Sequence, residues 1–497
     1  MISAEINELR KQGKLQAAEE TGLKALEENP DDIWVKRALS WVYYDSLKKA
    51  SNEINKQDFL DALRKIQELE LPDDETMFYD KLPYVIGKFL FALNRQKNNE
   101  PEILTHILDL IKDFNFPKPS ESYSLLLKAF RTHAGYWSGF LNFMDWWGME
   151  NFRDKDFEKE EMDGRKIPSL VEMALISYSK KLLEAYNLQA TDTSLKDRIK
   201  NFIKYLNQII RTHPDYLYLI LYKTKLLSIL GYREEAIQVF LPFARKKKMD
   251  FWVWNLLADL FEQNDAKKFY LLNKALSIPS NDNYKVKLHE KIIPLFLKRK
   301  MFDEAKTEVN AVINIRTKNN WTIPAEIFRY QHQGWYHSAR DRSSNRDIYQ
   351  KFSPKAEEIL FIDIPEELIV ISALNAPKNI AYFVVNKNIS GFFKYNRQPV
   401  IGKLYHARLQ KRNNGFYKLL TIREADEAKS SPALKIINEK INLHPKGFGF
   451  TTSGVFVPAQ IVQKYDIQDG ENIQAKVILS YDKLKKKWGW KVLEIFK

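Results

Sequence analysis

The sequence predicts a multidomain α + β protein, in which an N-terminal all-α helical-repeat solenoid is followed by two small C-terminal β-barrels. Three observations predict this fold class. Apolar residues recur at intervals of three and four from residue 1 to about 320, and short β-rich runs bounded by turn residues follow from about 361. Residues 381–497 also hold 21 Lys and Arg against 9 Asp and Glu, a surplus of 12 out of 14 for all 497 residues. Such an asymmetry indicates a polyanionic partner for the C-terminal part.

Residues 1–320 contain segments with the pattern of stacked helix pairs. In the first, GKLQAAEETGLKALEENPDD, Gly13 closes a helix, Ala18 and Ala25 allow two helices to approach closely, and Pro30 ends the second helix. Similar residues recur later in the chain, at Gly231, Ala236, Ala275, Phe302 and Ala305. The pattern resembles the tetratricopeptide (TPR) repeat, which has a period of about 34 residues. The resemblance implies a solenoid with a groove that recruits a protein partner.

The segment 131–168 interrupts these repeats with a dense group of aromatic residues and a following acidic run. The ring spacing of three and four predicts a buried stripe in the solenoid, and a pocket or partner site is the alternative. The aromatic residues are Tyr136, Trp137, Phe140, Phe143, Trp146 and Trp147. Residues 321–360 then mix aromatic residues with the polar stretch SARDRSSNRD, and we expect an irregular connector there.

The first predicted barrel spans residues 361–425 and contains the strand SGFFKYN at 390–396. In this strand, alternation places Phe393 and Tyr395 on one face and Lys394 on the other. We predict that Phe393 and Tyr395 contact nucleic acid. The alternative, that both rings fill the interior of the barrel, is equally open at this point.

The second predicted barrel spans residues 438–497 and carries the most informative motif, KGFGFTTSGVFVP at 446–458. Alternation places Phe448 and Phe450 on one face of a strand, and Phe456 can join them from the next strand. We expect Gly447 and Gly449 to leave these rings uncovered. Exposed rings beside a lysine, here Lys446, are typical of platforms on which unpaired bases stack.

A lysine run, Lys485, Lys486 and Lys487, occupies a predicted turn between the last two strands of this barrel. Loops of this kind commonly contact the ligand in small barrels of the OB type, so we expect phosphate contacts here. Trp488 and Trp490 follow on one strand face. They either extend the platform or close the barrel core, and we favour the core.

The motif at 446–458 resembles the two RNA-contact motifs of cold-shock domains, which are OB-type barrels. Pro458 stands where many cold-shock proteins have a histidine, a departure that is similar to the barrels of the ribonuclease II and R family. Those nucleases carry their catalysis in a separate aspartate-rich domain, so we do not expect that activity. The order of repeats and paired barrels resembles a component of bacterial TOTE conflict systems. That resemblance implies nucleic-acid sensing or tethering in antiviral defence, beside partner enzymes.

Searches for other chemistry find little. The chain has no cysteine, which excludes disulfides and thiolate metal sites and agrees with a cytoplasmic location. It has no apolar run long enough to span a membrane, and no phosphate-binding loop, HExxH motif or GxSxG elbow. The acidic run between Asp154 and Asp163 lacks the ligand order of a calcium loop, and we expect a solvated face. We therefore expect no catalytic residue, no metal and no cofactor.

The expected function is a non-catalytic adaptor. Its barrels bind single-stranded nucleic acid, with RNA favoured over DNA, and its repeats recruit a protein partner. A pure protein–protein scaffold is the first alternative. A metal-dependent nuclease that uses the acidic cluster at 154–163 is the second.

Overall fold

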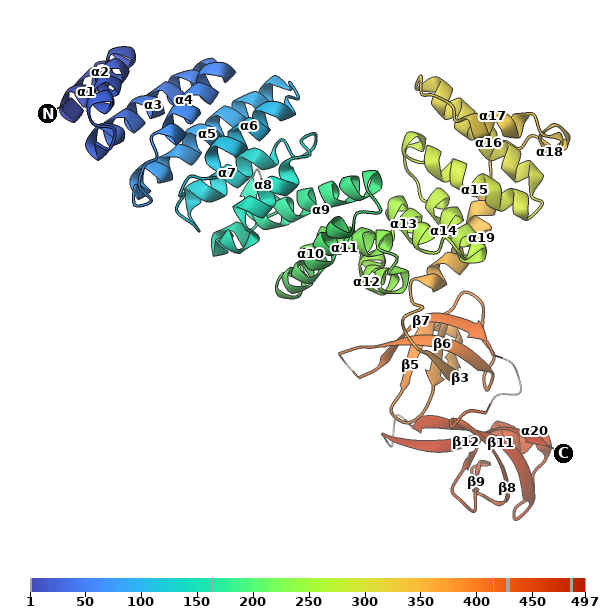
Figure 1. The fold of residues 1–497 in the computed structure, drawn as a ribbon. Helices are drawn as coiled ribbons and strands as arrows, with labels where there is room; N and C mark the ends of the chain where they lie inside the picture. Colours follow the sequence, from blue (N-terminus) through green and yellow to red (C-terminus); the bar gives the residue numbers. More distant parts are fainter. Residues whose placement is uncertain (1, 163, 414, 426–429, 483–485, 497) are drawn as a thin grey trace. The chain divides into compact units, whose positions relative to one another are not determined.

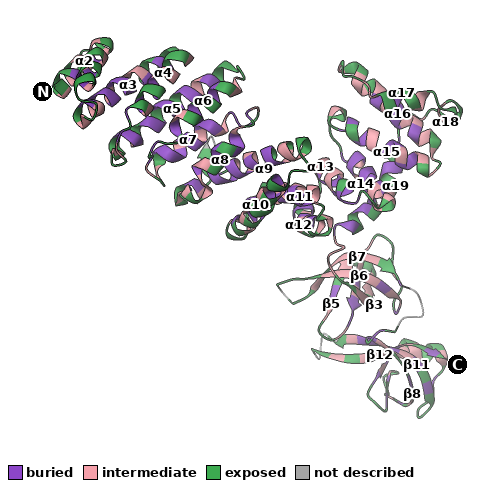
Figure 2. Ribbon diagram, viewed as in Figure 1, coloured by how far each residue is buried: buried purple, intermediate pink, exposed green. Residues whose placement is uncertain are grey.

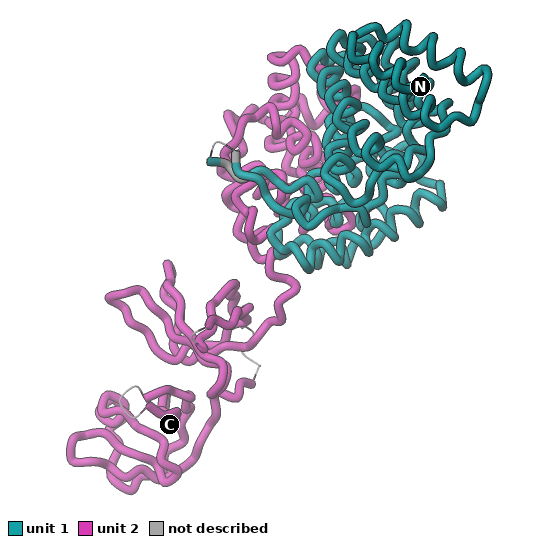
Figure 3. Tube along the Cα trace, turned by 90° about the vertical axis from the view of Figure 1, so that its left-hand side faces the viewer, with its two compact units in different colours: residues 1–243 teal, residues 244–497 magenta. Residues whose placement is uncertain are grey.

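The structure is a computed structural model that describes residues 2–162, 164–413, 415–425, 430–482 and 486–496. Within these ranges the chain is helical as far as Ile359, apart from one short hairpin, and two five-stranded closed barrels follow (Figure 1). The contacts divide the chain into two compact units, residues 1–243 and 244–497 (Figure 3). The predicted fold class, helical repeats followed by two small barrels, is confirmed.

The first unit is a succession of helix pairs. Alternate helices pack on one another, α1 on α3, α3 on α5 and α5 on α7, as expected for stacked repeats. None of the helices in the described ranges has both the length and the apolarity needed to cross a bilayer. The helices that begin in this unit are α1 (Ile2–Lys11), α2 (Leu15–Glu28), α3 (Ile33–Glu53), α4 (Lys56–Glu68), α5 (Thr76–Gln96), α6 (Pro101–Ile111), α7 (Glu121–Arg131), α8 (Phe140–Trp147), α9 (Leu170–Leu188), α10 (Thr193–Thr212), α11 (Leu217–Ile229) and α12 (Arg233–Lys246).

Local sequence signals account for many helix ends. The side chain of Asp32 accepts hydrogen bonds from the backbone N–H groups of Trp34 and Val35, and so caps the start of α3. Gly13 and Gly231 follow α1 and α11 with φ of +76° and +86°, a backbone conformation that favours glycine. The small residues that the repeat pattern singled out are all buried: Ala18, Ala25, Ala236, Ala275 and Ala305.

The aromatic residues of segment 131–168 form a buried stripe, in which Trp137 takes the buried place that the spacing predicted for Tyr136. Trp137, Phe140, Phe143 and Trp147 are at most 1% exposed, and the Trp147 ring stacks on that of Tyr123 at 5.2 Å. Tyr136 and Trp146 are half-buried at the edge of this cluster. Two short 3₁₀ helices, η1 (Met149–Asn151) and η2 (Asp154–Phe157), and the hairpin of β1 (Glu160–Met162) and β2 (Arg165–Ile167) follow.

The second unit begins with helices, and they continue through the segment that we expected to be an irregular connector. In residues 321–360, α19 packs on α14, because its apolar residues recur at helical spacing and are buried, as Figure 2 shows for this part of the chain. These helices are α13 (Phe251–Leu260), α14 (Asp265–Ser277), η3 (Asp282–Tyr284), α15 (Val286–Lys298), α16 (Phe302–Lys318), α17 (Ala325–Gln331), α18 (Gly334–Ser338) and α19 (Arg346–Ile359).

The two barrels have equivalent strand orders, β3-β4-β5-β7-β6 and β8-β9-β10-β12-β11. In each, the third strand pairs in parallel with the fifth, which closes the barrel. The first barrel consists of β3 (Glu366–Asn375), η4 (Ala376–Lys378), β4 (Ile380–Val384), β5 (Ser390–Lys394), β6 (Leu404–Lys411) and β7 (Tyr417–Glu424). The second consists of β8 (Leu434–Leu443), β9 (Gly449–Thr451), β10 (Phe456–Val457), α20 (Ala459–Tyr465), β11 (Asn472–Asp482) and β12 (Lys487–Phe496).

A shared apolar cluster joins the barrels. Val370 and Val384 of the first barrel and Ile478 and Leu479 of the second lie in it, and each is at most 3% exposed. Ala433 is fully buried between them and accepts a 2.9 Å hydrogen bond from the backbone N–H of Leu479. We call this cluster the barrel seam. Because it buries apolar surface from both sides, it holds the barrels against one another.

Candidate nucleic-acid interface

Three phenylalanine rings meet on the surface of the second barrel. The β9–β10 pairing sets Phe450 directly opposite Phe456, and their ring centroids are 5.6 Å apart. The Phe448 ring lies 5.8 Å from each of the other two. Phe450 is 37% exposed, and the other two rings are half-buried. We call these three residues the ring cluster.

Strand alternation places the ring cluster outside, because the neighbouring residues fill the barrel. Val455 and Val457 flank Phe456 and are at most 1% exposed in the core that also contains Ile441. Gly449 has a different role from the one we expected. A Cβ there would lie 2.7 Å from the Ile441 side chain and 3.0 Å from the Asn442 carbonyl oxygen, so close strand packing requires glycine. Gly447, with φ of +84°, serves the turn before β9.

His444 is a member of the site that the sequence analysis missed. Its imidazole stacks on the Phe448 ring at 4.4 Å with an interplanar angle of 7°. The turn that follows brings it there, because the His444 N–H donates to the Phe448 carbonyl oxygen at 2.7 Å. Its position two residues before Lys446 could have indicated from the sequence that His444 lies near the rings. One face of Phe448 is therefore covered, whereas Phe450 is 37% exposed.

The lysines lie at two distances from the ring cluster. Lys446 is exposed on the turn that leads into β9. Lys486 and Lys487 are exposed at the start of β12, whereas Lys485 lies outside the described residues. Phe456 pairs with Lys491, so Lys487, four residues earlier on the strand, is about 13 Å further away at about 3.3 Å per residue. The Lys486–Lys487 pair therefore lies apart from the ring cluster.

Trp488 and Trp490 do not belong to the ring cluster. Both are half-buried and pack against the barrel seam, and Trp490 also packs against the core of the second barrel. Lys435 lies over the Trp490 ring at 4.5 Å from the centroid. Both tryptophans therefore pack against buried clusters, as we favoured, but much of this packing lies between the two barrels.

The first barrel exposes a different ring from the two that we predicted. Phe393 and Tyr395 are half-buried and pack against the core of that barrel. Phe392 is 41% exposed instead, and its ring lies 6.1 Å from that of Tyr382 on β4. The pairing register explains this outcome. Phe392 opposes Tyr382 as Phe456 opposes Phe450, whereas Phe393 takes the place of the buried Val457.

The acidic run at 154–163 is partly neutralised by its own neighbours. Asp156 is 4% exposed and forms an ion pair with Arg153 at 3.0 Å, and Glu160 forms one with Lys128 at 3.3 Å. Across the described part of the chain, no three His, Asp or Glu side chains gather as a metal site. Asp163 itself lies outside the described residues.

Family models match both barrels. Residues 361–420 match S1/CSD-like domain 1 of the TOTE conflict systems, and residues 435–495 match S1/CSD-like domain 2 of these systems. The C-terminal region contains two S1/CSD-like TOTE domains. Upstream of them, residues 217–356 match a domain of unknown function, DUF7017. S1/CSD-like domain 1 thus begins directly after α19, and domain 2 contains the ring cluster.

Among solved structures, two helical proteins resemble the chain at low similarity. The structure of Naa15/Naa10 bound to HypK-THB is 11% identical, with a TM-score of 0.27, over 72% of this chain and 53% of that one. The chain therefore spans about half the length of this relative. The APC/C hetero-tetramer Cut9–Hcn1 is 12% identical, with a TM-score of 0.20, over 72% of this chain and 95% of that one. No curated protein matches the chain.

Proposed function

We propose that the chain is a non-catalytic adaptor of a conflict system, in which S1/CSD-like domain 2 binds single-stranded nucleic acid and the helical repeats recruit a protein. The ring cluster is the observation that supports this most directly. Phe448, Phe450 and Phe456 stand together on the outer face while valines fill the interior. Each base that stacks on such a ring contributes about 1–3 kcal/mol.

Charge supports the same ligand. Lys446 is exposed beside the rings, and residues 381–497, which contain S1/CSD-like domain 2 and most of domain 1, have a surplus of 12 positive charges. Each neutralised phosphate on a single strand steepens the dependence of log affinity on log salt by about 0.7. We favour RNA over DNA, because the motif at 446–458 resembles the RNA-contact motifs of cold-shock domains. In S1/CSD-like domain 1, Phe392 and Tyr382 are the corresponding pair, so we place a second, smaller contact there.

The experiment measures the affinity of the full chain for fluorescein-labelled single-stranded RNA and DNA at two salt concentrations. The test variant is Phe448→Ala/Phe450→Ala. The matched control is Phe496→Ala, because Phe496 is 40% exposed but lies outside the ring cluster. We expect a loss of about tenfold or more for the test variant and little change for the control. Equal affinity in both, with unchanged circular dichroism, would leave the protein–protein scaffold as the better reading.

A further inference from the structure

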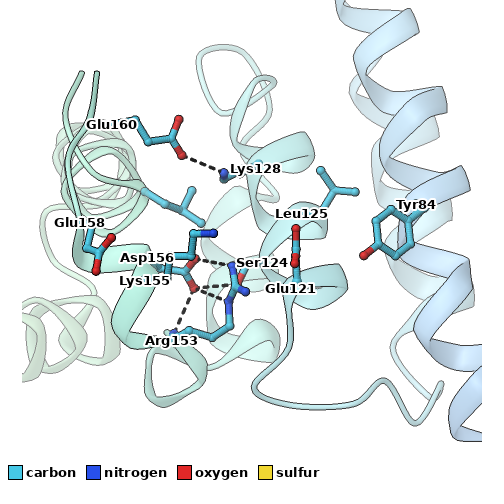
Figure 4. A pocket seen from close by; sticks show the side chains of 11 residues that line it. Tyr84, Glu121, Ser124, Leu125, Lys128, Arg153, Lys155, Asp156, Glu158 and Glu160 are labelled. Carbon is cyan, nitrogen blue, oxygen red and sulfur yellow. Dashed lines mark hydrogen bonds and ion pairs between the residues drawn. The ribbon is translucent and has the colours of Figure 1, made fainter. Parts of the chain in front are cut away.

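Two neighbouring hollows of different electrostatic character lie on the first unit. One hollow, of about 550 Å³, lies between the ends of α3 and α5, and the other, of about 210 Å³, lies between α7 and the segment around η2 (Figure 4). Tyr84 and Leu125 border both hollows, so the two hollows lie next to one another. We call the whole the inner groove.

The α5 end of the inner groove is basic. Lys88 and Arg95 are its charged border residues, both are exposed, and no carboxylate of a described residue borders this hollow. Lys88 donates to the side-chain oxygen of Asn52, and neither cation forms an ion pair within the ranges that the structure describes. Several other cations of this unit do have acidic partners, as in the pairs Arg37–Glu75, Lys56–Glu100 and Lys65–Glu19.

The other end of the inner groove has the opposite balance. Two of its four carboxylates are paired, Asp156 with Arg153 and Glu160 with Lys128. The other charged residues that border this hollow are two acids, Glu121 and Glu158, and one cation, Lys155. Figure 4 shows Glu158 and Glu160 on the opposite side of this hollow from Tyr84. The sign of the groove therefore reverses across Tyr84 and Leu125.

The middle of the inner groove is apolar, and its basic hollow has a polar group without a hydrogen-bond partner among the described residues. Tyr84 is 41% exposed, and Leu125, Phe91 and Ala92 are half-buried around it. Ser51 borders the basic hollow and is 2% exposed, and its hydroxyl has no hydrogen-bond partner among the described residues. A buried hydroxyl of this kind is satisfied when a ligand or water supplies the missing group.

We propose that the inner groove binds an extended protein segment with an acidic end, an apolar centre and a neutral or basic end. The inference rests on the protein-recruiting part of the proposed function and names the chemistry of the partner. Lys88 and Arg95 would receive the acidic end, and Tyr84 and Leu125 the apolar side chain. Helices α3, α5 and α7 pack in succession, so two helix spacings of about 8–10 Å each leave room for roughly five to six extended residues.

The reversal of sign distinguishes this ligand from a nucleic acid. A single strand carries one negative charge at every nucleotide, and its phosphates would be repelled at the end bordered by Glu121 and Glu158. A peptide can match the change of sign because its side chains differ along its length. The ring of Tyr84 is also partly engaged, since Lys81 lies 5.8 Å from its centroid.

The test uses the full chain and fluorescein-labelled peptides of about eight residues. One peptide has an acidic half, a central leucine and phenylalanine, and a basic half; a second has the reverse order, and a third is a scramble of the same composition. We expect one ordered peptide to bind at least about tenfold more tightly than the scramble. The variant Lys88→Glu/Arg95→Glu should remove that preference. The matched control is Lys24→Glu/Lys204→Glu, because these exposed lysines border neither hollow.

Reversing one charge at the acidic end of the inner groove gives a second test of the peptide's orientation. Glu121→Lys should weaken the ordered peptide and strengthen an entirely acidic one, whereas a merely structural role of Glu121 would move both in the same direction. The RNA affinity of every variant is measured in parallel. The inference fails if neither ordered peptide exceeds the scramble, or if Lys88→Glu/Arg95→Glu weakens RNA instead. Retained RNA binding in the first case would leave the nucleic-acid part of the proposed function intact.

Discussion

The two S1/CSD-like domains have the same strand order but differ in which aromatic side chains they expose. In domain 2, Phe450 and Phe456 oppose one another outside and Phe448 and His444 enlarge the surface. In domain 1, only Tyr382 and Phe392 form the corresponding pair, and Phe393 has turned into the core. Cross-strand register, and not the presence of rings in a strand, decides what faces a ligand. We therefore expect domain 2 to contribute more to binding than domain 1.

Substitution of the exposed rings in each domain tests the ranking directly. Phe448→Ala/Phe450→Ala should weaken single-strand binding by about 2–4 kcal/mol, because two stacking rings are lost. Tyr382→Ala/Phe392→Ala removes a smaller surface and should cost about 1 kcal/mol. Fluorescence anisotropy of labelled RNA with the full chain measures both. An equal or larger loss from domain 1 would reverse the ranking.

A second effect separates the two neighbouring rings of domain 1. Phe393→Ala opens a space in the core and should lower the local stability of this domain by about 2–3 kcal/mol, less than for a fully buried ring. Phe392→Ala should change it by less than about 0.5 kcal/mol, because the ring is exposed. Hydrogen exchange read by mass spectrometry reports on β4 and β5 without isolating the domain. Faster exchange in Phe392→Ala than in Phe393→Ala would contradict the assigned register.

A third effect concerns the contact between the domains. Gly402 has φ of +78°, and a Cβ there would lie 2.7 Å from the Leu493 side chain of the other barrel. Gly402→Ala should therefore cost about 2 kcal/mol, roughly half from the backbone and half from the crowding. Gly470→Ala is the matched control, since Gly470 has the same φ with no atom within 4 Å of the added Cβ. Exchange protection of β3 and β11 measures the loss, and Leu493→Ala should recover part of it if crowding is the cause.

The smallest effect compares one acid in each domain. A hydrogen bond from Arg423 lowers the pKa of Glu366 in domain 1, and hydrogen bonds from Thr451 and Ser453 lower the pKa of Glu439 in domain 2. A lowered pKa in the folded state contributes stability above the unfolded pKa, near 4.5, which is lost as the pH falls through the folded value. Glu366→Gln and Glu439→Gln should each flatten this loss in exchange measured between pH 3 and 6. High salt should reduce the contribution of Glu366 more, because its partner is an exposed cation.

The sequence alone predicted which rings are exposed in domain 2, but not which rings are exposed in domain 1. In KGFGFTTSGVFV the rings recur with period two and valines take the other face, so alternation alone predicts which side chains lie outside. In SGFFKYN two rings are adjacent, one must face each way, and the choice depends on the pairing of Phe392 with Tyr382 on another strand. His444 likewise reaches the site through a turn, and no periodicity reports that.

Contacts between elements far apart in the sequence account for the remaining differences. Trp488 and Trp490 lie on a strand that reads as ordinary barrel core, yet they pack where a second barrel meets the first. Helix α19 was missed because the polar stretch SARDRSSNRD, in which it begins, resembles a linker, whereas its buried face is completed by α14. In both cases the partner surface, and not the local pattern, stabilises the element.

The barrel seam has a consequence for how long a ligand must be. Apolar packing at the seam fixes the distance between the exposed rings of the two barrels. A single strand would therefore need a minimum length to contact both sets of rings at once. Oligonucleotides below that length would gain affinity gradually with each added nucleotide. The shortest oligonucleotide that contacts both sets of rings would show a single large increase in affinity, because its second contact forms at high effective concentration.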